Sequence, residues 1–228
     1  MEAKILFVDD ERTFSSMTQE YLEAKGLQVV LVHAAEEGLQ RFKEEVFDLC
    51  ILDIKMPMKD GYELASELRA LNHQIPFIFL SGLHKKEQRI KGLAMGADDY
   101  ITKPFSVEEL YLRVRNILQR TKADQPKQGH SVFSIGRYQF NETTHELMRE
   151  KRTLKLTAIE AQLLGIFCER PNQVIERKVF LTRIWGDEQN LKGRSLNVYV
   201  SKVRQHLSDE PRVEIMNVHG VGYKMLIR

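Results

Sequence analysis

The sequence LCILDIKMPMKDGYEL (residues 49–64) joins a short apolar run to a polar loop and then to an amphipathic stretch. Four other short apolar runs in the first half also precede amphipathic stretches. All five lack polar alternation and are rich in Ile, Val and Phe, which is typical of strands that are buried on both faces. The runs are ILFV (5–8), VVLV (29–32), LCILDI (49–54), FIFLS (77–81) and DYIT (99–102).

A segment of helical length follows each run, and the last of these segments is the most clearly periodic. Its apolar residues share one helical face, and Ser106 with Glu109 predicts a capping box at its start. Alternating strands and helices predict an α/β unit, a (βα)5 parallel sheet covered by helices on both sides. The helical segments lie near 12–25, 35–45, 61–71, 85–95 and 107–120.

The pattern changes after residue 120. Residues 121–131 are polar, contain Pro and Gly, and indicate a linker between a first domain at 1–120 and a second at 132–228. The second domain reads as α+β. Short β-like runs fill 132–156, and Thr157 with Glu160 predicts another capping box. Further helices are expected near 177–185 and 194–207, before a C-terminal hairpin.

Polar residues follow several of the predicted strands of the first domain. Asp9 and Asp10 end the first strand, Asp53 the third and Ser81 the fourth, and Lys103 follows the fifth. Ligands bind beyond the carboxyl ends of parallel strands, so these groups should meet at one edge of the sheet. Clustered carboxylates need a cation, and Mg²⁺ prefers oxygen ligands. An Asp can also act as a nucleophile and form an aspartyl-phosphate. The set predicts phosphoryl transfer to a carboxylate.

Charge is distributed unevenly along the chain. Residues 1–120 carry 16 Lys and Arg against 20 Asp and Glu, a charge of −4, whereas residues 121–228 carry 18 against 12, a charge of +6. The basic half indicates an anionic partner. Cys50 and Cys168 both lie in apolar runs and form no disulfide framework, which fits a reducing cytosol. With no apolar stretch of membrane-spanning length and no signal peptide, we expect a cytoplasmic protein.

The predicted helix at 194–207 has an apolar stripe and a polar outer face. Leu196, Val200 and Val203 recur at helical spacing and should face the core. An outer face rich in polar and basic side chains can enter the major groove of DNA, although a solvated amphipathic helix has the same pattern. The preceding helix and the basic C-terminal hairpin favour a winged helix-turn-helix.

The motifs VDDE, LDIKMPMKDGYEL, SG and GADDYITKPF resemble, in order and spacing, the signature of the receiver domain of two-component response regulators. The resemblance covers residues 3–120 and implies a flavodoxin-like fold. It implies phosphorylation at Asp53 by a sensor histidine kinase. Mg²⁺ would be held by Asp9, Asp10, Asp53 and the backbone carbonyl of Lys55. The same likeness assigns phosphoryl contact to Lys103 and switch positions to Ser81 and Tyr100.

Residues 85–115 resemble the face through which receivers of the OmpR/PhoB subfamily form homodimers on phosphorylation. Across a two-fold axis the pairs would be Arg89 with Glu109, Asp98 with Arg115 and Asp99 with Arg113, and Leu93 and Ala94 would supply the apolar centre. Such pairs set register more than affinity. A solvated face of mixed charge is the alternative interpretation.

Residues 132–228 resemble the effector domain of the same subfamily through LTAIEAQLL, RSLNVYVSKVRQHL and NVHGVGYKM. The resemblance implies promoter DNA as a partner, and RNA polymerase as a second partner near residues 186–193. Two departures stand out, because the family often has Asp at the position of Asn197 and usually Arg at that of His219. The residues expected to face DNA are Arg194, Ser195, Asn197, Ser201, Lys202, Arg204 and His219.

The sequence therefore predicts a phosphorylation-regulated transcription factor that is not an enzyme, apart from catalysing its own phosphorylation and dephosphorylation. One alternative is a constitutive DNA-binding dimer with an unused receiver, although scaffolding alone has no use for clustered carboxylates. The other is a Mg²⁺-dependent phosphohydrolase that forms an aspartyl-phosphate. It would need a leaving-group pocket and a nearby acid/base carboxylate, and the sequence indicates neither beyond the receiver set.

Overall fold

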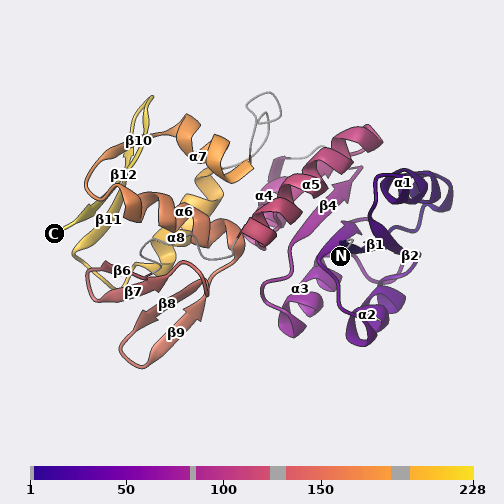
Figure 1. The fold of residues 1–228 in the computed structure, drawn as a ribbon, viewed down its shortest axis with the longest axis horizontal. Helices are drawn as coiled ribbons and strands as arrows, with labels where there is room; N and C mark the ends of the chain where they lie inside the picture. The colour runs from indigo at the N-terminus through magenta and orange to yellow at the C-terminus, as the bar shows by residue number, and fades with distance from the viewer. Residues whose placement is uncertain (1–2, 83–85, 124–131, 186–195) are drawn as a thin grey trace. The chain divides into compact units, whose positions relative to one another are not determined.

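A computed structural model describes residues 3–82, 86–123, 132–185 and 196–228 of the chain (Figure 1). The chain divides into two compact units, Met1–Arg120 and Thr121–Arg228. Most of the expected linker, from residue 124 to 131, lies outside the described residues.

The first unit is built around a five-stranded sheet of order β2-β1-β3-β4-β5, in which every neighbouring pair is parallel. The parallel sheet that the apolar runs predict is thus confirmed, with strand ends within about one residue of those expected. The strands are β1 (Lys4–Val8), β2 (Gln28–Val32), β3 (Leu49–Asp53), β4 (Phe77–Ser81) and β5 (Asp99–Thr102).

Helices cover both faces of this sheet because alternate strand residues point to opposite sides. Ile5 and Phe7 of β1 belong to the cluster that includes α1 and α5 side chains. On the opposite face, Val8 contacts Gly38 of α2, and Phe79 contacts Gly92 of α4. The helices are α1 (Arg12–Ala24), α2 (Ala35–Glu44), α3 (Gly61–Leu71), α4 (Lys86–Ala94) and α5 (Val107–Ala123).

Helix starts follow local capping chemistry. Asp60 caps α3 in a full capping box with Glu63, a feature that the sequence analysis did not predict. At the start of α5, the Ser106 hydroxyl accepts a hydrogen bond from the Glu109 N–H at 3.4 Å. The helix continues to Ala123, three residues into the expected linker, because residues 121–123 contain no helix-breaking Pro or Gly.

The second unit begins with a four-stranded antiparallel sheet and continues with helices and a second sheet of order β10-β12-β11. The two hairpin strands β11 and β12 form the C-terminal wing that the sequence predicts. Helix α8 starts at Leu196 in the described residues, so the first two residues of the expected helix lie outside them. The elements are β6 (Val132–Ile135), β7 (Tyr138–Asn141), β8 (Glu146–Arg149), β9 (Arg152–Lys155), α6 (Ala158–Glu169), β10 (Val174–Glu176), α7 (Arg177–Trp185), α8 (Leu196–His206), β11 (Val213–Val218) and β12 (Gly222–Ile227).

The predicted capping box of α6 is confirmed. The Thr157 hydroxyl accepts from the Glu160 N–H, and the Glu160 carboxylate accepts from the Thr157 N–H at 2.9 Å. Strand β10 was not predicted, because three residues are too few to show a period. It pairs with β12, where a Cβ at Gly222 would lie 2.0 Å from the Ile175 carbonyl oxygen. Only glycine fits this close approach, which fastens the wing to the start of α7.

A buried carboxylate joins the first sheet of the second unit to the segment after α8. Glu210 is 1% exposed and accepts hydrogen bonds from the side chains of Arg137, at 3.0 Å, and Arg212, at 3.1 Å. The Arg212 hydrogen bond contributes most to the shift that lowers the pKa of Glu210 to about 2, and Arg137 adds to it while burial opposes it. Among the described residues, no helix is long and apolar enough to cross a membrane.

We predict that Glu210→Gln destabilises the second unit at neutral pH and flattens its response to acid. A carboxyl whose pKa is depressed by folding stabilises the fold above its ordinary pKa of 4.5, and this stabilisation is lost as the pH falls toward 2. Fluorescence of Trp185, the single Trp, reports unfolding of this unit. The control is Glu214→Gln, because Glu214 is exposed. Equal urea midpoints for the two variants at pH 7 would contradict the prediction.

Candidate functional site

Three carboxylates converge at the carboxyl edge of the first sheet. Asp9 follows β1, Asp10 is the next residue, and Asp53 ends β3. Each offers an oxygen that lies within 4.8 Å of the oxygens of the other two, close enough to hold one metal ion. Asp9 and Asp53 are buried, whereas Asp10 is exposed. The parallel pairing of β1 with β3 brings these residues together across more than forty positions of sequence.

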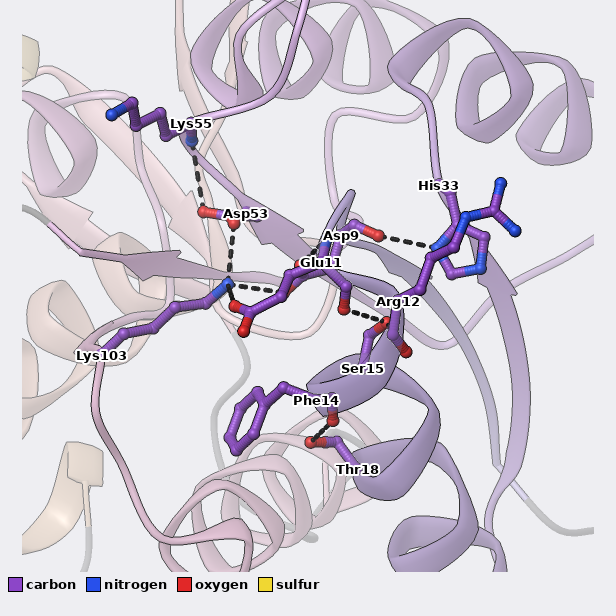
Figure 2. Close-up of polar contacts among 10 residues, drawn as sticks. All are labelled: Asp9, Glu11, Arg12, Phe14, Ser15, Thr18, His33, Asp53, Lys55 and Lys103. Carbon is purple, nitrogen blue, oxygen red and sulfur yellow. Dashed lines mark hydrogen bonds and ion pairs between the residues drawn. The ribbon is translucent and has the colours of Figure 1, made fainter.

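The Lys103 ammonium lies between two of the carboxylates (Figure 2). Its Nζ donates to Asp9 Oδ2 and to Asp53 Oδ2, both at 2.8 Å, and lies 3.7 Å from Glu11 Oε2. The backbone of Lys103 donates to the Ser81 carbonyl oxygen at 2.7 Å, which fixes the start of the β5–α5 loop to the end of β4. The ends of β1, β3 and β4 therefore place the Lys103 ammonium between the carboxylates of Asp9 and Asp53.

The electrostatics of the pocket follow from burial. Burial raises the pKa of Asp9, and hydrogen bonding to Lys103 opposes that rise. Burial alone would lower the pKa of Lys103, but hydrogen bonds and attraction to Asp53 and Asp9 outweigh it, so the pKa lies above its usual value. The pocket thus holds a charged amine against two buried carboxylates.

Loop geometry orients the acceptor oxygens. Asp53 Oδ1 accepts a hydrogen bond from the Lys55 N–H at 3.2 Å, while the Lys55 side chain points away from the pocket (Figure 2). A Cβ at Gly61 would lie 2.2 Å from the Asp53 carbonyl oxygen, so only glycine lets α3 begin this close to β3. The second oxygen of Asp53 remains directed at Lys103.

Two residues near the pocket were assigned no role from the sequence. Glu11 donates its backbone N–H to Asp9 Oδ1 at 2.9 Å, and its carboxylate lies on the exposed side of Lys103. His33 follows β2, and its Nδ1 lies 2.9 Å from the Asp9 carbonyl oxygen, which makes Nδ1–H the donor. Glu11 is part of the VDDE motif and was within reach of sequence reasoning, whereas nothing in the sequence marks His33 as a neighbour.

The pocket has the parts needed to move a phosphoryl group onto a carboxylate. Asp53 supplies a nucleophilic oxygen, and Lys103 supplies a positive charge within hydrogen-bonding distance of it. The three carboxylates offer the oxygen ligands that Mg²⁺ prefers, and their negative charge requires a cation. The donor set therefore fits Mg²⁺.

The two expected switch residues lie beside this pocket. Ser81 is fully buried at the end of β4. Tyr100 is buried as well, and its ring packs edge-on against Phe79, with ring centroids 6.4 Å apart. A Cβ at Gly92 would lie 3.1 Å from the Tyr100 ring, so α4 packs closely over it. In this structure the Tyr100 side chain is directed into the molecule.

The residues expected at a dimer interface differ widely in exposure. Leu93 is only 3% exposed, while its neighbour Ile90 is 38% exposed and was not predicted. Ala94 is exposed and Arg89 is half-buried. Asp98 is buried and accepts a hydrogen bond from the Phe77 N–H at 3.2 Å.

Arg113 forms two ion pairs on this face. Arg113 Nη1 lies 2.7 Å from Asp99 Oδ2, and Arg113 Nη2 lies 2.5 Å from Glu109 Oε1. The pairing of Asp99 with Arg113 between two copies of the chain stays a prediction. The guanidinium of exposed Arg115 lies over the Tyr111 ring, 5.9 Å from its centroid.

Helix α8 places its predicted outer residues in different surroundings. Ser201 and Asn197 are exposed, and His219 is exposed at the turn of the wing. Asn197 is held by two residues that sequence reasoning missed, because its Oδ1 accepts from Tyr223 at 2.7 Å and from Arg177 at 2.9 Å. Arg194 and Ser195 lie outside the described residues.

Two basic residues of α8 have partners inside the unit. Lys202 Nζ lies 3.1 Å from Glu160 Oε1, and burial of Glu160 is outweighed by His206 and Lys202, which hold its pKa well below the usual range. Arg204 donates to the Ile215 carbonyl oxygen at 2.8 Å and to Asn217 Oδ1 at 3.0 Å. Both side chains therefore also join α8 to its neighbours.

Comparison with known families supports both halves of this description. Residues 5–115 match the family described as "Response regulator receiver domain", and residues 151–225 match "Transcriptional regulatory protein, C terminal". The transcriptional regulatory protein RprY of Bacteroides fragilis is 41% identical over 223 residues, which cover 98% of this chain and 94% of that protein. The response regulator MprA of Mycobacterium ulcerans is 34% identical, covering 98% and 97%.

Among solved structures, the response regulator DrrB of Thermotoga maritima, described as an OmpR/PhoB homologue, aligns over the full length of both chains with a TM-score of 0.53 and 26% identity. The match spans the five-stranded parallel sheet and the C-terminal unit together. The expected order of the two folds is thus confirmed.

Lys103→Met is expected to destabilise the first unit by about 3 kcal/mol in metal-free buffer at neutral pH, because removal of one partner leaves the buried Asp9 charge uncompensated. Calorimetric unfolding measures the loss. Lys55→Met is the matched control, since the Lys55 side chain points into solvent. Indistinguishable unfolding of the two variants would mean that the Lys103 ion pairs contribute nothing to stability.

Proposed function

We propose how this chain works from one premise: it belongs to the OmpR/PhoB family of transcriptional response regulators. It is therefore a phosphorylation-regulated transcription factor, with the first unit as receiver and the second as effector. We assign the phosphoryl acceptor to Asp53 and place the DNA-reading face on α8 and the wing. The observation that carries the assignment is the Lys103 ammonium bound to both Asp53 and Asp9 at 2.8 Å.

In the proposed reaction, Asp53 Oδ2 attacks the phosphorus of a phosphohistidine in a sensor histidine kinase. An O–P bond forms, the N–P bond breaks, and the imidazole leaves with a proton from solvent. Lys103 donates a hydrogen bond to the transferred group and offsets its charge. Mg²⁺ held by Asp9, Asp10, Asp53 and the Lys55 carbonyl would neutralise phosphoryl oxygens.

The receiver's catalysis is limited to its own phosphorylation and the hydrolysis of its own acyl phosphate. Hydrolysis needs a water molecule at phosphorus, and the pocket opens to solvent beside Asp10 and Glu11, which are both exposed. We propose no turnover of external phosphate esters.

The proposed switch uses the two residues next to the pocket. The Ser81 hydroxyl donates a hydrogen bond to a phosphoryl oxygen on Asp53, which favours the state with the Tyr100 ring buried beneath α4. The buried Tyr100 ring, with Gly92 close against it, supports this assignment.

The second unit is proposed to bind promoter DNA through α8, with the wing approaching the minor groove. Exposed Asn197, Ser201 and His219 and the charge of +6 over residues 121–228 support this. RNA polymerase is the proposed partner of residues 186–193, which lie outside the described residues. A regulator that binds the genome acts in the cytoplasm of a bacterial cell.

We also propose that phosphorylation favours a homodimer through α4, β5 and α5. The network of Arg113 with Asp99 and Glu109 supports this, because it can exchange partners with a second copy at little electrostatic cost. Exposed Ile90 supplies an apolar contact in place of Leu93, which is buried.

Asp53→Asn should abolish phosphorylation by radiolabelled acetyl phosphate in the presence of Mg²⁺. An amide cannot form the acyl phosphate under these conditions, whereas the wild-type carboxylate can. Hydroxylamine-labile label on the full chain measures the reaction. Labelling of a folded Asp53→Asn chain at the wild-type level would remove Asp53 from the role.

Glu11→Gln is the control for this experiment. It removes a negative charge 3.7 Å from Lys103 but leaves the acceptor in place, so label incorporation should persist. The same samples tested by light scattering should show a mass increase on phosphorylation for wild type and for Glu11→Gln only. A mass increase in Asp53→Asn would show that dimerisation does not require phosphorylation of Asp53.

Ser201→Glu should weaken duplex binding by the full chain about tenfold at low salt, because a new negative charge on α8 would face DNA phosphates. The matched control is Thr153→Glu, on exposed strand β9, which should bind as wild type does. Fluorescence anisotropy with a labelled duplex measures both. Equal losses in the two variants would indicate a net-charge effect and not a DNA face on α8.

A further inference from the structure

A cavity of about 240 Å³ opens between the wing, the first turn of α8 and the start of α7. Its lining brings together segments that lie more than forty residues apart in sequence. None of the lining residues is acidic, and Arg177 carries a positive charge. The lining residues are Arg177, Asn197, Asn217, Val218, His219, Gly220, Val221, Gly222 and Tyr223.

Arg177 is held in this cavity by both its backbone and its side chain. Its N–H donates to the Val221 carbonyl oxygen at 3.0 Å, which ties it to the wing. Its Nη1 donates to Asn197 Oδ1 at 2.9 Å and lies 3.4 Å from the Tyr223 hydroxyl oxygen. The Tyr223 hydroxyl donates to the same Asn197 oxygen at 2.7 Å. One amide oxygen therefore positions both the guanidinium and the phenol.

The positive charge of Arg177 is not cancelled by this arrangement. Asn197 is neutral, and no carboxylate in the described part of the chain lies within ion-pair distance of Arg177. Arg177 is exposed, and its Nε and Nη2 donors have no partner among the described residues. A guanidinium presents several donors in a planar fork that matches two phosphate oxygens.

A second arginine, outside the lining, is bound to one of the lining residues. Arg204 Nη2 donates to Asn217 Oδ1 at 3.0 Å, and Asn217 lines the cavity. Each guanidinium thus donates to a neutral amide oxygen, and Arg177 is held in the cavity lining with its positive charge retained. Preorganised donors lower the entropic cost of binding an anion.

We propose that this cavity binds a phosphodiester of the DNA backbone through Arg177, and that Asn197 is the positioning residue that orients Arg177 while leaving its charge uncancelled. The inference rests on the proposed DNA-binding function and assigns the groove beside the wing to one phosphate. Where the family often has Asp at position 197, a carboxylate would pair with Arg177 and weaken its attraction for phosphate.

The first test is Arg177→Gln in the full chain, measured by anisotropy with a labelled mixed-sequence duplex between about 50 and 200 mM salt. Loss of one phosphate contact should weaken binding about tenfold and reduce the slope of log affinity against log salt by about one. The control is Arg170→Gln, another exposed arginine outside the cavity, which should leave the slope unchanged.

The second test is Asn197→Asp, which separates positioning from fold. The new carboxylate should pair with Arg177, so the unfolding midpoint reported by Trp185 should hold or rise. DNA affinity should nevertheless fall by about tenfold, since the cation is neutralised. A purely structural role would move stability and binding in the same direction.

The outcomes distinguish this inference from the function on which it rests. If the wild-type chain fails to bind any duplex at low salt, the DNA-binding proposal itself is wrong. If wild type binds and both Arg177→Gln and Asn197→Asp keep its affinity and salt slope, only the phosphate site is overturned. If Asn197→Asp lowers stability and affinity together, Asn197 is structural and its proposed electrostatic role is wrong.

Discussion

The Lys103 ammonium between Asp9 and Asp53 is the interaction on which the first unit depends. Carboxylates whose oxygens lie within 4.8 Å repel one another strongly where water is excluded. The sheet nevertheless brings them together, because parallel strands must end at the same edge. The Lys103 ammonium lies 2.8 Å from a carboxylate oxygen of Asp9 and of Asp53 and offsets this repulsion. Three carboxylates still outnumber one ammonium, and this excess of negative charge favours binding of a divalent cation. The charged side chains that stabilise the fold are thus also those that would bind the cation.

Much of the first unit could be predicted because its sequence signal is local. The run LCILDI is apolar throughout, and a strand covered on both faces needs that composition. The placement of Asp9, Asp53 and Lys103 then follows from topology, since the carboxyl ends of parallel strands converge. Glycines mark the closest approaches, but their partners cannot be read from sequence. Gly61 against the Asp53 carbonyl and Gly92 against Tyr100 became clear only in the structure.

The predictions that depended on helical periodicity were less complete. A period assigns a residue to a face and does not name its partner. Lys202 and Arg204 fall on the outer face of α8 as expected, yet Glu160 and Asn217 reach them from distant segments. In α4, Leu93 is 3% exposed and Ile90 is 38% exposed, a difference that the sequence did not predict. Strand β10 was not predicted because its three residues show no period, and its partner β12 lies far along the chain.

The two units use their carboxylates and basic side chains in opposite ways. In the first unit, carboxylates outnumber cations at the pocket, so that a metal ion and then a phosphoryl group can be held. In the second, carboxylates such as Glu160 and Glu210 are buried and fully paired, where they join elements of the fold. Around the wing, amide oxygens take over the positioning of arginines. An amide orients a guanidinium as a carboxylate does but does not reduce its charge, and a surface that must attract DNA needs that difference.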